Sequence, residues 1–298
     1  MSKILASDGV EIRHRHWCAE NPKAILLIIH GMAEHIDRYA SFARELNAAG
    51  ISAVGLELRG HGNGAVRLGW FAQKNGWQAV LDDCFALLNH IREENPSLPL
   101  MIYGHSMGTI FARAIIMDIR AERLRISACV LTGVTVDLPV RRHFAPALTK
   151  AIGAFTGINK PSAFLAKMTF GAFNNAFKPN STEYDWLSRD AEQVQRYIDD
   201  PLCGFDCTPS LMCDVSTALL HTLKKQNERL ILCPVMIAVG ESDPVGGTKA
   251  AYFLEKRWRA IGKDVEVKVY PGARHELLNE TNRSDISADI IGYIARCI

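Results

Sequence analysis

The sequence predicts an α/β protein built on a mostly parallel β-sheet that is covered by helices on both faces. Three observations predict this class. Short runs rich in β-branched residues alternate along the chain with helical patterns several turns long. The run at 24–30 is apolar on both faces, as in a strand buried inside a parallel sheet. Hydrophobic residues make up 48% and charged residues 22% of the 298 positions, which excludes a disordered or fibrous chain.

The predicted elements follow one another in a regular order. The first two strands form an edge hairpin that turns at Asp8-Gly9, and the buried run at 24–30 is the third strand. An amphipathic helix comes next, with Asp37 as its expected N-cap and Gly50 as its stop. The remaining strands of an eight-stranded sheet are expected over 51–58, 98–103, 126–134, 234–239 and 265–269, and the remaining helices over 77–91, 107–119, 248–261 and 284–298.

One stretch interrupts this alternation. Between Val136 and Thr208 the pattern contains no strand, but it contains two helical segments at 143–155 and 161–177. Seven of the 12 phenylalanines of the chain lie in this stretch. We therefore expect a core domain made of residues 1–136 and 209–298, interrupted by a helical cap, or lid, of residues 137–208.

A candidate nucleophile lies where a strand runs directly into a helix. The pentapeptide Gly104-His105-Ser106-Met107-Gly108 has the spacing G-x-S-x-G and this strand–turn–helix context. A serine on such a tight turn needs strained backbone angles, and neighbours without a Cβ allow the strand and the helix to approach closely. The pattern predicts that Ser106 is held above the carboxyl edge of the sheet as a nucleophile.

A serine hydroxyl needs a base and an acid that orients the base. His275 follows the last predicted strand and is expected to be the base, because it is the late histidine that lies in such a loop. Asp243 follows the preceding strand and is the preferred acid. Glu241, two residues earlier, and Asp137, after the strand that follows the nucleophile helix, are the alternative acids.

The developing oxyanion of acyl transfer needs hydrogen-bond donors. The tight turn at Ser106, a nucleophile elbow, is expected to supply one donor, the N–H of Met107. The loop after the first buried strand is expected to supply the other, the N–H of Met32, because Gly31 lets the backbone turn inward. His30 is expected to hold this loop through a buried hydrogen bond. Glu34, His35 and Arg38 are expected either to form an ion-pair cluster at the mouth of the site or merely to begin the helix.

Composition limits the partners and the cofactors. The formal net charge of +2 excludes a global attraction to nucleic acid. Among the eight cysteines, Cys203, Cys207 and Cys213 cluster along the chain, but no flanking histidine spacing supports a zinc site. We expect a cytoplasmic protein with reduced thiols, no metal and no cofactor.

At this point the sequence resembles the α/β-hydrolase superfamily, and within it the monoacylglycerol lipase and lysophospholipase branch that is grouped with the S33-type serine aminopeptidases. The stretches that carry the resemblance are HGMAEHIDRY (30–39), LRGHG (58–62), GHSMG (104–108), GESDPV (240–245) and YPGARHELLNE (270–280). The resemblance implies the triad Ser106, Asp243 and His275, an oxyanion hole from Met32 and Met107, and a helical lid. Glu57 stands where relatives commonly have Asp, so the turn there is expected to differ.

The apolar stripes of the expected lid bear on the substrate. Phe144, Phe155, Phe164 and Met168 are candidates to line an acyl-binding pocket or an exposed patch, although such stripes usually form the interface with the domain beneath. Basic residues on the same segment favour transient contact with a membrane or micelle surface, unless they simply form a solvated face.

The sequence thus predicts a serine carboxylester hydrolase that forms an acyl-enzyme with monoacylglycerol or lysophospholipid-type esters, a small-molecule lipid or ester substrate. Two alternatives stay open. An aminopeptidase of the same fold would hold the substrate amine with lid carboxylates such as Glu183, Asp185 and Glu192. A catalytically silent α/β-hydrolase would bind a ligand without turning it over.

Overall fold

The computed structural model describes residues 1–136 and 145–298, and its centre is one eight-stranded sheet with the order β1-β2-β4-β3-β5-β6-β7-β8. The strands β3 to β8 run parallel to one another, whereas β2 pairs antiparallel with both β1 and β4, so the hairpin β1–β2 lies at one edge of the sheet, as the sequence predicts. The strands are β1 (Ser2–Leu5), β2 (Glu11–Trp17), β3 (Ala24–Ile29), β4 (Ile51–Leu56), β5 (Leu100–His105), β6 (Ile126–Thr132), β7 (Val235–Gly240) and β8 (Val265–Tyr270).

The central strands are buried on both faces because apolar side chains alternate into two cores. Leu27 and Ile29 of β3 enter one core, and Leu26 and Ile28 enter the other. The last strand of the sheet, β8, is only partly buried. Its valines alternate with charged residues, as expected for an outer strand.

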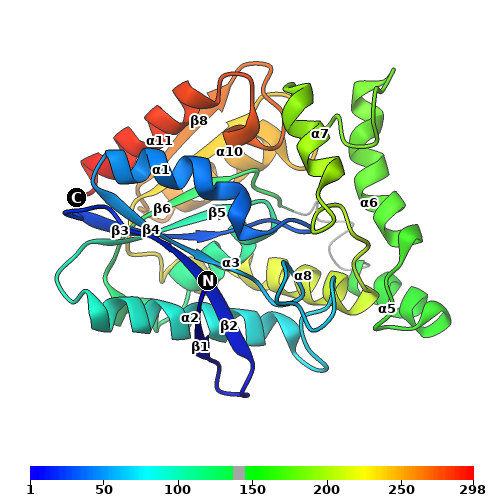
Figure 1. Cartoon of the computed structure of the whole chain (residues 1–298), viewed down its shortest axis with the longest axis horizontal. Coiled ribbons are helices and arrows are strands. Elements are labelled where there is room, and N and C mark those ends of the chain that lie inside the picture. The colour runs from blue at the N-terminus through cyan, green and yellow to red at the C-terminus, as the bar shows by residue number, and fades with distance from the viewer. Residues whose placement is uncertain (137–144) are drawn as a thin grey trace.

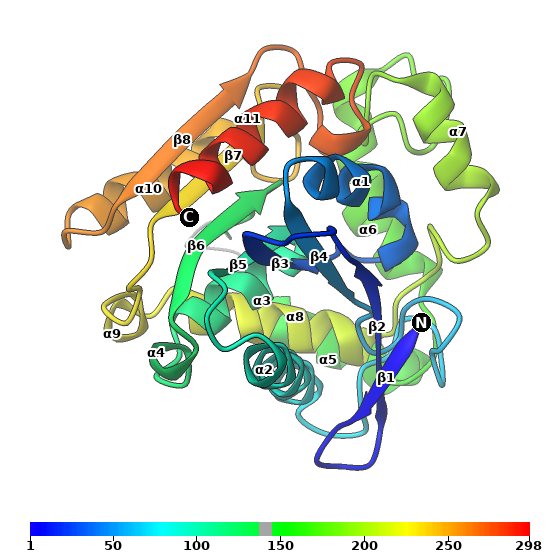
Figure 2. The same cartoon turned by 60° about the vertical axis from the view of Figure 1, so that its left-hand side comes forward.

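Helices cover both faces of the sheet, as Figures 1 and 2 show. On one face α1 and α11 pack against the sheet, and on the other α2, α3 and α10 supply apolar side chains to the larger core. These helices are α1 (Ala40–Ala48), α2 (Gly76–Glu94), α3 (Met107–Ile116), α10 (Gly247–Arg259) and α11 (Arg283–Arg296), with the short helices η1 (Ile36–Tyr39), α4 (Ala121–Leu124) and η3 (Leu277–Asn279) beside them.

The expected N-cap of the first helix is wrong. The 3-10 helix η1 precedes α1, and its N-cap is His35 rather than Asp37. The side chain of Asp37 instead pairs with Arg15 of β2, with 2.8 Å between Nε and Oδ1. An ion pair across two elements takes the place of a local cap here.

In the described residues between β6 and β7 the regular elements are helices, and in Figure 1 the helices α5 to α7 stand beyond one side of the sheet. The two helical segments predicted there correspond to α5 and α6, whereas α7 and α8 were not predicted. The helices of this stretch are α5 (Ala145–Thr156), α6 (Ala163–Asn174), η2 (Asn175–Phe177), α7 (Ala191–Asp199), α8 (Pro209–Thr222) and α9 (Lys225–Glu228). In the described part of the chain no helix has the length and apolar character needed to cross a membrane.

Candidate active site

Ser106 lies on a strained turn between β5 and α3. Its backbone angles are φ 51° and ψ −118°, in a region that residues with a Cβ rarely adopt. The backbone around it is fixed, because the N–H of Ser106 donates to the Thr132 carbonyl at 2.9 Å and the N–H of Thr109 donates to the Ser106 carbonyl at 2.9 Å. Strain that is held in this way is typical of a nucleophile elbow.

The two glycines of the pentapeptide allow this turn. A Cβ built on Gly104 would lie 2.7 Å from the Gly108 carbonyl oxygen. A Cβ built on Gly108 would lie 2.1 Å from the carbonyl oxygen of Ile29 in the neighbouring strand. Backbone fills both places, so neither position accepts a larger residue without moving the elbow.

The structure brings together the three residues predicted for the triad. The Nε2 of His275 lies 2.9 Å from the Oγ of Ser106, and its Nδ1 lies 3.0 Å from the Oδ1 of Asp243. All three follow the carboxyl ends of parallel strands, which is why residues so distant in sequence meet. Since Asp243 accepts at Nδ1, the neutral imidazole carries its proton there and presents a lone pair to the serine.

The alternative acids have other positions. The Oε2 of Glu241 accepts the N–H of Gly272 at 3.0 Å, and the Glu241 side chain is exposed. Asp137 lies outside the described residues. Asp243 is buried, and one of its oxygens also accepts the N–H of Val245 at 2.9 Å, which fixes the carboxylate in its loop.

Two histidines beside Ser106 have opposite pKa shifts. Burial lowers the pKa of His275, but the charge and hydrogen bond of Asp243 outweigh burial and raise it above the ordinary value. Burial, and to a smaller extent the charge of the nearby His275, lowers the pKa of His105 to about 4. The two rings lie 4.9 Å apart, and His105 Nδ1 lies 3.0 Å from the Thr132 hydroxyl. His105 is therefore a neutral packing residue beside the turn that carries Ser106.

The loop after β3 lies against Ser106. A Cβ on Gly31 would lie 3.2 Å from the Cβ of Ser106, so only glycine lets the loop come this close. Within the described residues the N–H groups of Met32 and Met107 donate to no carbonyl or side chain. His30 holds this loop as expected, because it is fully buried with its Nδ1 2.8 Å from the Gly31 carbonyl oxygen.

A nearly buried ion cluster connects the loop after β3 to the loop that carries His275. The guanidinium of Arg38 donates to both oxygens of Glu276 at 2.7 Å and to Glu34 at 2.8 Å. Glu34 in turn accepts the N–H of Gly31 at 2.6 Å. The Glu34–Arg38 pair was one of the expectations from the sequence, but Glu276, which lies 238 residues further along, was not.

His35 does not join this cluster. Its Nε2 lies 2.8 Å from the Oδ2 of Asp200, in the connection between α7 and α8. Two neighbouring residues of one motif thus contact different parts of the molecule.

The stretch YDWLSRD (184–190) covers His275. The indole of Trp186 lies 5.1 Å from the imidazole of His275, and the N–H of Glu276 donates to the Leu187 carbonyl at 2.8 Å. Trp186 also stacks on Phe170 of α6, with 5.8 Å between the rings. Trp186 was not predicted as a site residue.

A cavity of about 790 Å³ lies beside α6, and none of Ser106, Asp243, His275 and Trp186 lines it. It is lined by Met168 and Phe170 of α6 and by Tyr184. Of the other predicted substrate residues, Phe155 is 92% and Phe164 61% exposed, and Phe144 lies outside the described residues. The described positions therefore place Met168 at the cavity and both phenylalanines on the surface.

Comparison with known proteins identifies the family. The model of the family described as "Serine aminopeptidase, S33" matches residues 20–282. The chain belongs to this family. It is 27% identical to a monoacylglycerol lipase of Mycolicibacterium smegmatis over 96% of this chain and 93% of that protein. It is 27% identical to the monoglyceride lipase of Homo sapiens over 93% of this chain and 84% of that protein.

Solved structures show the same fold. A thermostable carboxyl esterase of Bacillus coagulans superimposes with a TM-score of 0.90, at 23% identity, over 99% of this chain and 97% of that one. The chain therefore has the α/β-hydrolase fold, and the resemblance drawn from the five sequence motifs is confirmed.

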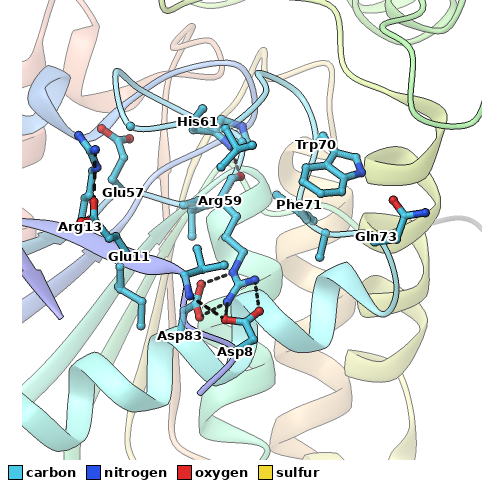
Figure 3. Close-up of a pocket in the computed structure, with 18 residues that line it drawn as sticks. Asp8, Glu11, Arg13, Glu57, Arg59, His61, Trp70, Phe71, Gln73 and Asp83 are labelled. Carbon is cyan, nitrogen blue, oxygen red and sulfur yellow. Dashed lines mark hydrogen bonds and ion pairs between the residues drawn. The ribbon is translucent and has the colours of Figure 1, made fainter. Parts of the chain in front are cut away.

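The arginine of the LRGHG turn is held by two carboxylates. As Figure 3 shows, the Arg59 guanidinium is clamped between Asp8 and Asp83, with Nε 2.6 Å from Asp83 Oδ2 and Nη1 2.6 Å from Asp8 Oδ2. It borders a cavity of about 200 Å³ that none of Ser106, Asp243 and His275 lines.

Glu57 is the residue at which the sequence is expected to depart from its relatives. Its carboxylate is buried and accepts the N–H of Ile36 at 3.3 Å. A Cβ on Gly62 would lie 2.1 Å from its Oε2, so the longer side chain fits because the turn has glycine there. Glu57 thereby fixes the end of β4 against the start of η1.

Proposed function

We propose that this protein is a serine carboxylester hydrolase that acts through an acyl-enzyme. The observation that carries the proposal is the hydrogen-bonded chain from Asp243 through His275 to Ser106, on a strained turn beside a glycine loop. Distances of 2.9 and 3.0 Å are those required for proton transfer to a positioned base. The names of the relatives, monoacylglycerol and monoglyceride lipases, support the ester class.

In the first half-reaction, Ser106 Oγ attacks the ester carbonyl while His275 Nε2 takes its proton. Asp243 keeps the imidazole oriented and stabilises the imidazolium that forms. The N–H groups of Met32 and Met107 stabilise the tetrahedral oxyanion, each donor being worth about 10²–10³ in rate. His275 then protonates the leaving alcohol, and the acyl group remains on Ser106.

In the second half-reaction, water replaces the alcohol. His275 takes a proton from that water, which attacks the acyl-enzyme, and the same two amides stabilise the second oxyanion. Ser106 recovers its proton from His275 as the fatty acid leaves. The enzyme needs no other group for this cycle, because the base, the acid and both amides belong to the chain.

For the substrate we propose monoacylglycerols or lysophospholipids. The 790 Å³ cavity on the α6 side of Trp186 is large enough for an alkyl chain, and each buried methylene contributes about 0.8 kcal/mol. We propose that residues 137–208 act as a lid over the core formed by residues 1–136 and 209–298. An acyl chain seated in the cavity would reach Ser106 past Trp186, whose ring touches both Phe170 and His275.

The aminopeptidase alternative has weaker support. The Asp185 carboxylate accepts the N–H groups of Ser181 and Thr182, at 2.6 and 3.0 Å. Glu192 pairs with Arg196 on the exposed side of α7. Of the three carboxylates expected to hold an amine, only Glu183 lines the cavity.

A fluorophosphonate probe tests the proposed nucleophile and the silent alternative together. We expect the intact protein to be labelled and Ser106→Ala to remain unlabelled. Ser216→Ala, which removes a hydroxyl that bonds within α8, is the matched control and should label like the parent protein. Absence of labelling, or equal labelling of Ser106→Ala, would overturn the proposal.

The substrate class needs a separate measurement. We expect p-nitrophenyl esters of medium and long chains, monoacylglycerols and lysophospholipids to be hydrolysed far faster than proline β-naphthylamide. Dominant cleavage of the amide would favour the aminopeptidase and refute the lipid proposal, even if Ser106 is the nucleophile.

A further inference from the structure

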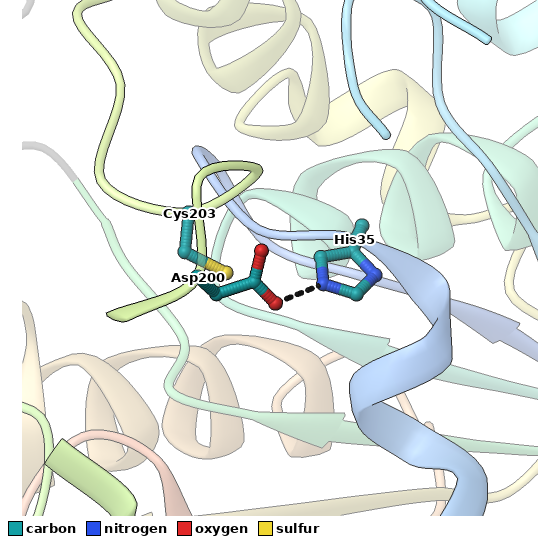
Figure 4. Close-up of side chains that lie close together, drawn as sticks. All are labelled: His35, Asp200 and Cys203. Carbon is teal, nitrogen blue, oxygen red and sulfur yellow. Dashed lines mark hydrogen bonds and ion pairs between the residues drawn. The ribbon is translucent and has the colours of Figure 1, made fainter. Parts of the chain in front are cut away.

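We propose that His35, Asp200 and Cys203 form a binding site for a divalent zinc-type ion. Figure 4 shows the three side chains converging at one place, although His35 comes from the start of η1 and the other two from the connection between α7 and α8. One ligand atom from each residue lies within 4.8 Å of those of the other two. This site lies outside the proposed Ser–His–Asp machinery.

The donor set selects the ion. Thiolate, imidazole and carboxylate are the three ligand types that zinc takes in proteins, whereas magnesium and calcium prefer oxygen alone. Zinc bonds of about 2.0–2.3 Å place the ligand atoms about 3.3–3.8 Å apart. The Nε2–Oδ2 distance of His35 and Asp200 is 2.8 Å, so small side-chain rotations give this spacing. Water would complete a four-coordinate site.

The backbone holds the ligands before an ion arrives. The Asp200–Cys203 turn is closed by the N–H of Cys203, which donates to the Asp200 carbonyl at 2.9 Å, and by the N–H of Leu202, which donates to Asp200 Oδ1 at 2.8 Å. The N–H of Gly204 then donates to the Ala33 carbonyl at 2.9 Å. This bond attaches the turn directly beside His35, so little ordering is left for the ion to impose.

Charge and access also suit a cation. Among the described residues that act on Cys203, the carboxylates of Glu34, Glu276 and Asp200 outnumber the guanidinium of Arg38, which leaves these surroundings negative. His35 and Cys203 are each only 9% exposed, which limits competition from water. The Asp200 side chain is 30% exposed and provides the route of entry.

Zinc binding at this site releases one proton. The zinc–sulfur bond replaces the S–H bond of Cys203, whose proton passes to solvent. The imidazole proton that points to Asp200 moves from Nε2 to Nδ1, and the metal takes its place. A bound ion would then join the loop after β3 to the connection between α7 and α8.

No local sequence pattern indicates this site. The search around Cys203, Cys207 and Cys213 for nearby histidines fails because His35 lies 165 residues before Asp200. The parallel sheet brings the two regions together, since the loop after β3 and the stretch between β6 and β7 meet at the same edge.

Cobalt titration tests the proposal without reference to catalysis. The reduced, chelator-treated protein should bind one Co²⁺, with a thiolate-to-cobalt charge-transfer band in the near ultraviolet and the intense visible bands of tetrahedral cobalt, and Zn²⁺ should displace it. Cys203→Ala and Cys203→Ser should lose the charge-transfer band, and His35→Ala and Asp200→Asn should bind at least about 100-fold more weakly.

Matched controls separate this site from adventitious binding. Cys213→Ala removes a cysteine that is not a proposed ligand, and His16→Ala removes one of the two neighbouring histidines, His14 and His16, of β2. Both variants should retain the charge-transfer band and the affinity for Co²⁺. Circular dichroism confirms that each variant is folded. Absence of the band in the parent protein, or its persistence in both folded Cys203 variants, would overturn the site, whereas fluorophosphonate labelling would be unaffected by either result.

Discussion

At the scale of single residues, the candidate site depends on backbone that admits no side chain. Gly108 lies against the carbonyl oxygens of Ile29 and His30, at 2.1 and 2.6 Å from a Cβ placed on it. Gly108→Ala should therefore push α3 away from β3 and lower the free energy of unfolding by about 1–3 kcal/mol, with loss of fluorophosphonate labelling. Urea denaturation measures the first effect.

Gly292→Ala is the matched control for this change. Gly292 lies in α11, and a Cβ there meets nothing within 4 Å, so alanine should raise helix stability by about 0.5–1 kcal/mol. Equal stability of Gly108→Ala and the parent protein would show that the elbow can relax and that its glycines are dispensable.

The pKa of His275 determines the acidic side of the activity profile. The base must be neutral to accept the Ser106 proton, and its pKa is raised because Asp243, with smaller contributions from Glu276 and Glu34, outweighs burial. We therefore expect kcat/KM to fall with decreasing pH through a pKa above the ordinary histidine value of about 6.5.

Asp243→Asn removes the charge that raises this pKa. The acidic limb of kcat/KM should move to lower pH, because the imidazolium loses its stabilising carboxylate, and kcat should fall by about 10⁴. Glu241→Gln, in the same loop but exposed, should change neither quantity. A limb that stays in place in Asp243→Asn would show that another group is the acid.

At the scale of elements, Arg38 joins η1 to the loop that carries His275. All three side chains of the Glu34–Arg38–Glu276 cluster are nearly buried. Burial alone would raise the pKa of Glu34, but the charge of Arg38 and smaller contributions outweigh burial and hold this pKa well below the ordinary value. Arg38→Met should cost about 3–5 kcal/mol, because it leaves two carboxylates buried without a cation.

Two further variants make this prediction specific. Arg196→Met removes an exposed arginine paired with Glu192 and should cost less than about 0.5 kcal/mol. Glu276→Gln added to Arg38→Met should recover part of the stability, since it removes one uncompensated charge. A loss below about 1 kcal/mol for Arg38→Met alone would contradict a structural role for the cluster.

The elements also show which features local sequence determines. The strands of the sheet were predictable because their apolar runs are long and β-rich, as for β3 and β7, and the elbow was predictable because glycines mark it. Helix α7 was missed because its residues are mostly polar and only Val194 and Tyr197 are buried. The local sequence also could not predict that Asp37 pairs with Arg15 and does not cap the helix.

At the scale of the whole molecule, the parts that sequence could not reveal are contacts between distant segments. His275 and Asp243 could be placed beside Ser106 because parallel strands deliver their loops to one edge. Nothing local could pair Arg38 with Glu276, which joins η1 to the loop after β8. The pairings of His35 with Asp200 and of Trp186 with His275 depend on how the stretch between β6 and β7 packs on the core. The least predictable contacts are therefore those around the proposed substrate path.

The exposed aromatic side chains of α5 and α6 lead to a prediction for the intact protein at a lipid surface. Phe155 and Phe164 are 92% and 61% exposed, and both lie in the helical stretch that borders the cavity. Transfer of a phenylalanine side chain from water to an apolar phase is worth about 1.5–3 kcal/mol. We therefore expect Phe155→Ser combined with Phe164→Ser to weaken binding to phospholipid vesicles at least about tenfold.

Sedimentation with vesicles measures this binding, and the ratio of activity on emulsified monoacylglycerol to activity on a dissolved short-chain ester should fall in parallel. Leu232→Ser is the matched control, because Leu232 is 73% exposed but precedes β7 at the opposite edge of the sheet. Equal vesicle binding by the double variant and the parent protein would place lipid contact elsewhere. An equal loss in Leu232→Ser would show that general surface hydrophobicity, and not the α5–α6 face, brings this protein to lipid.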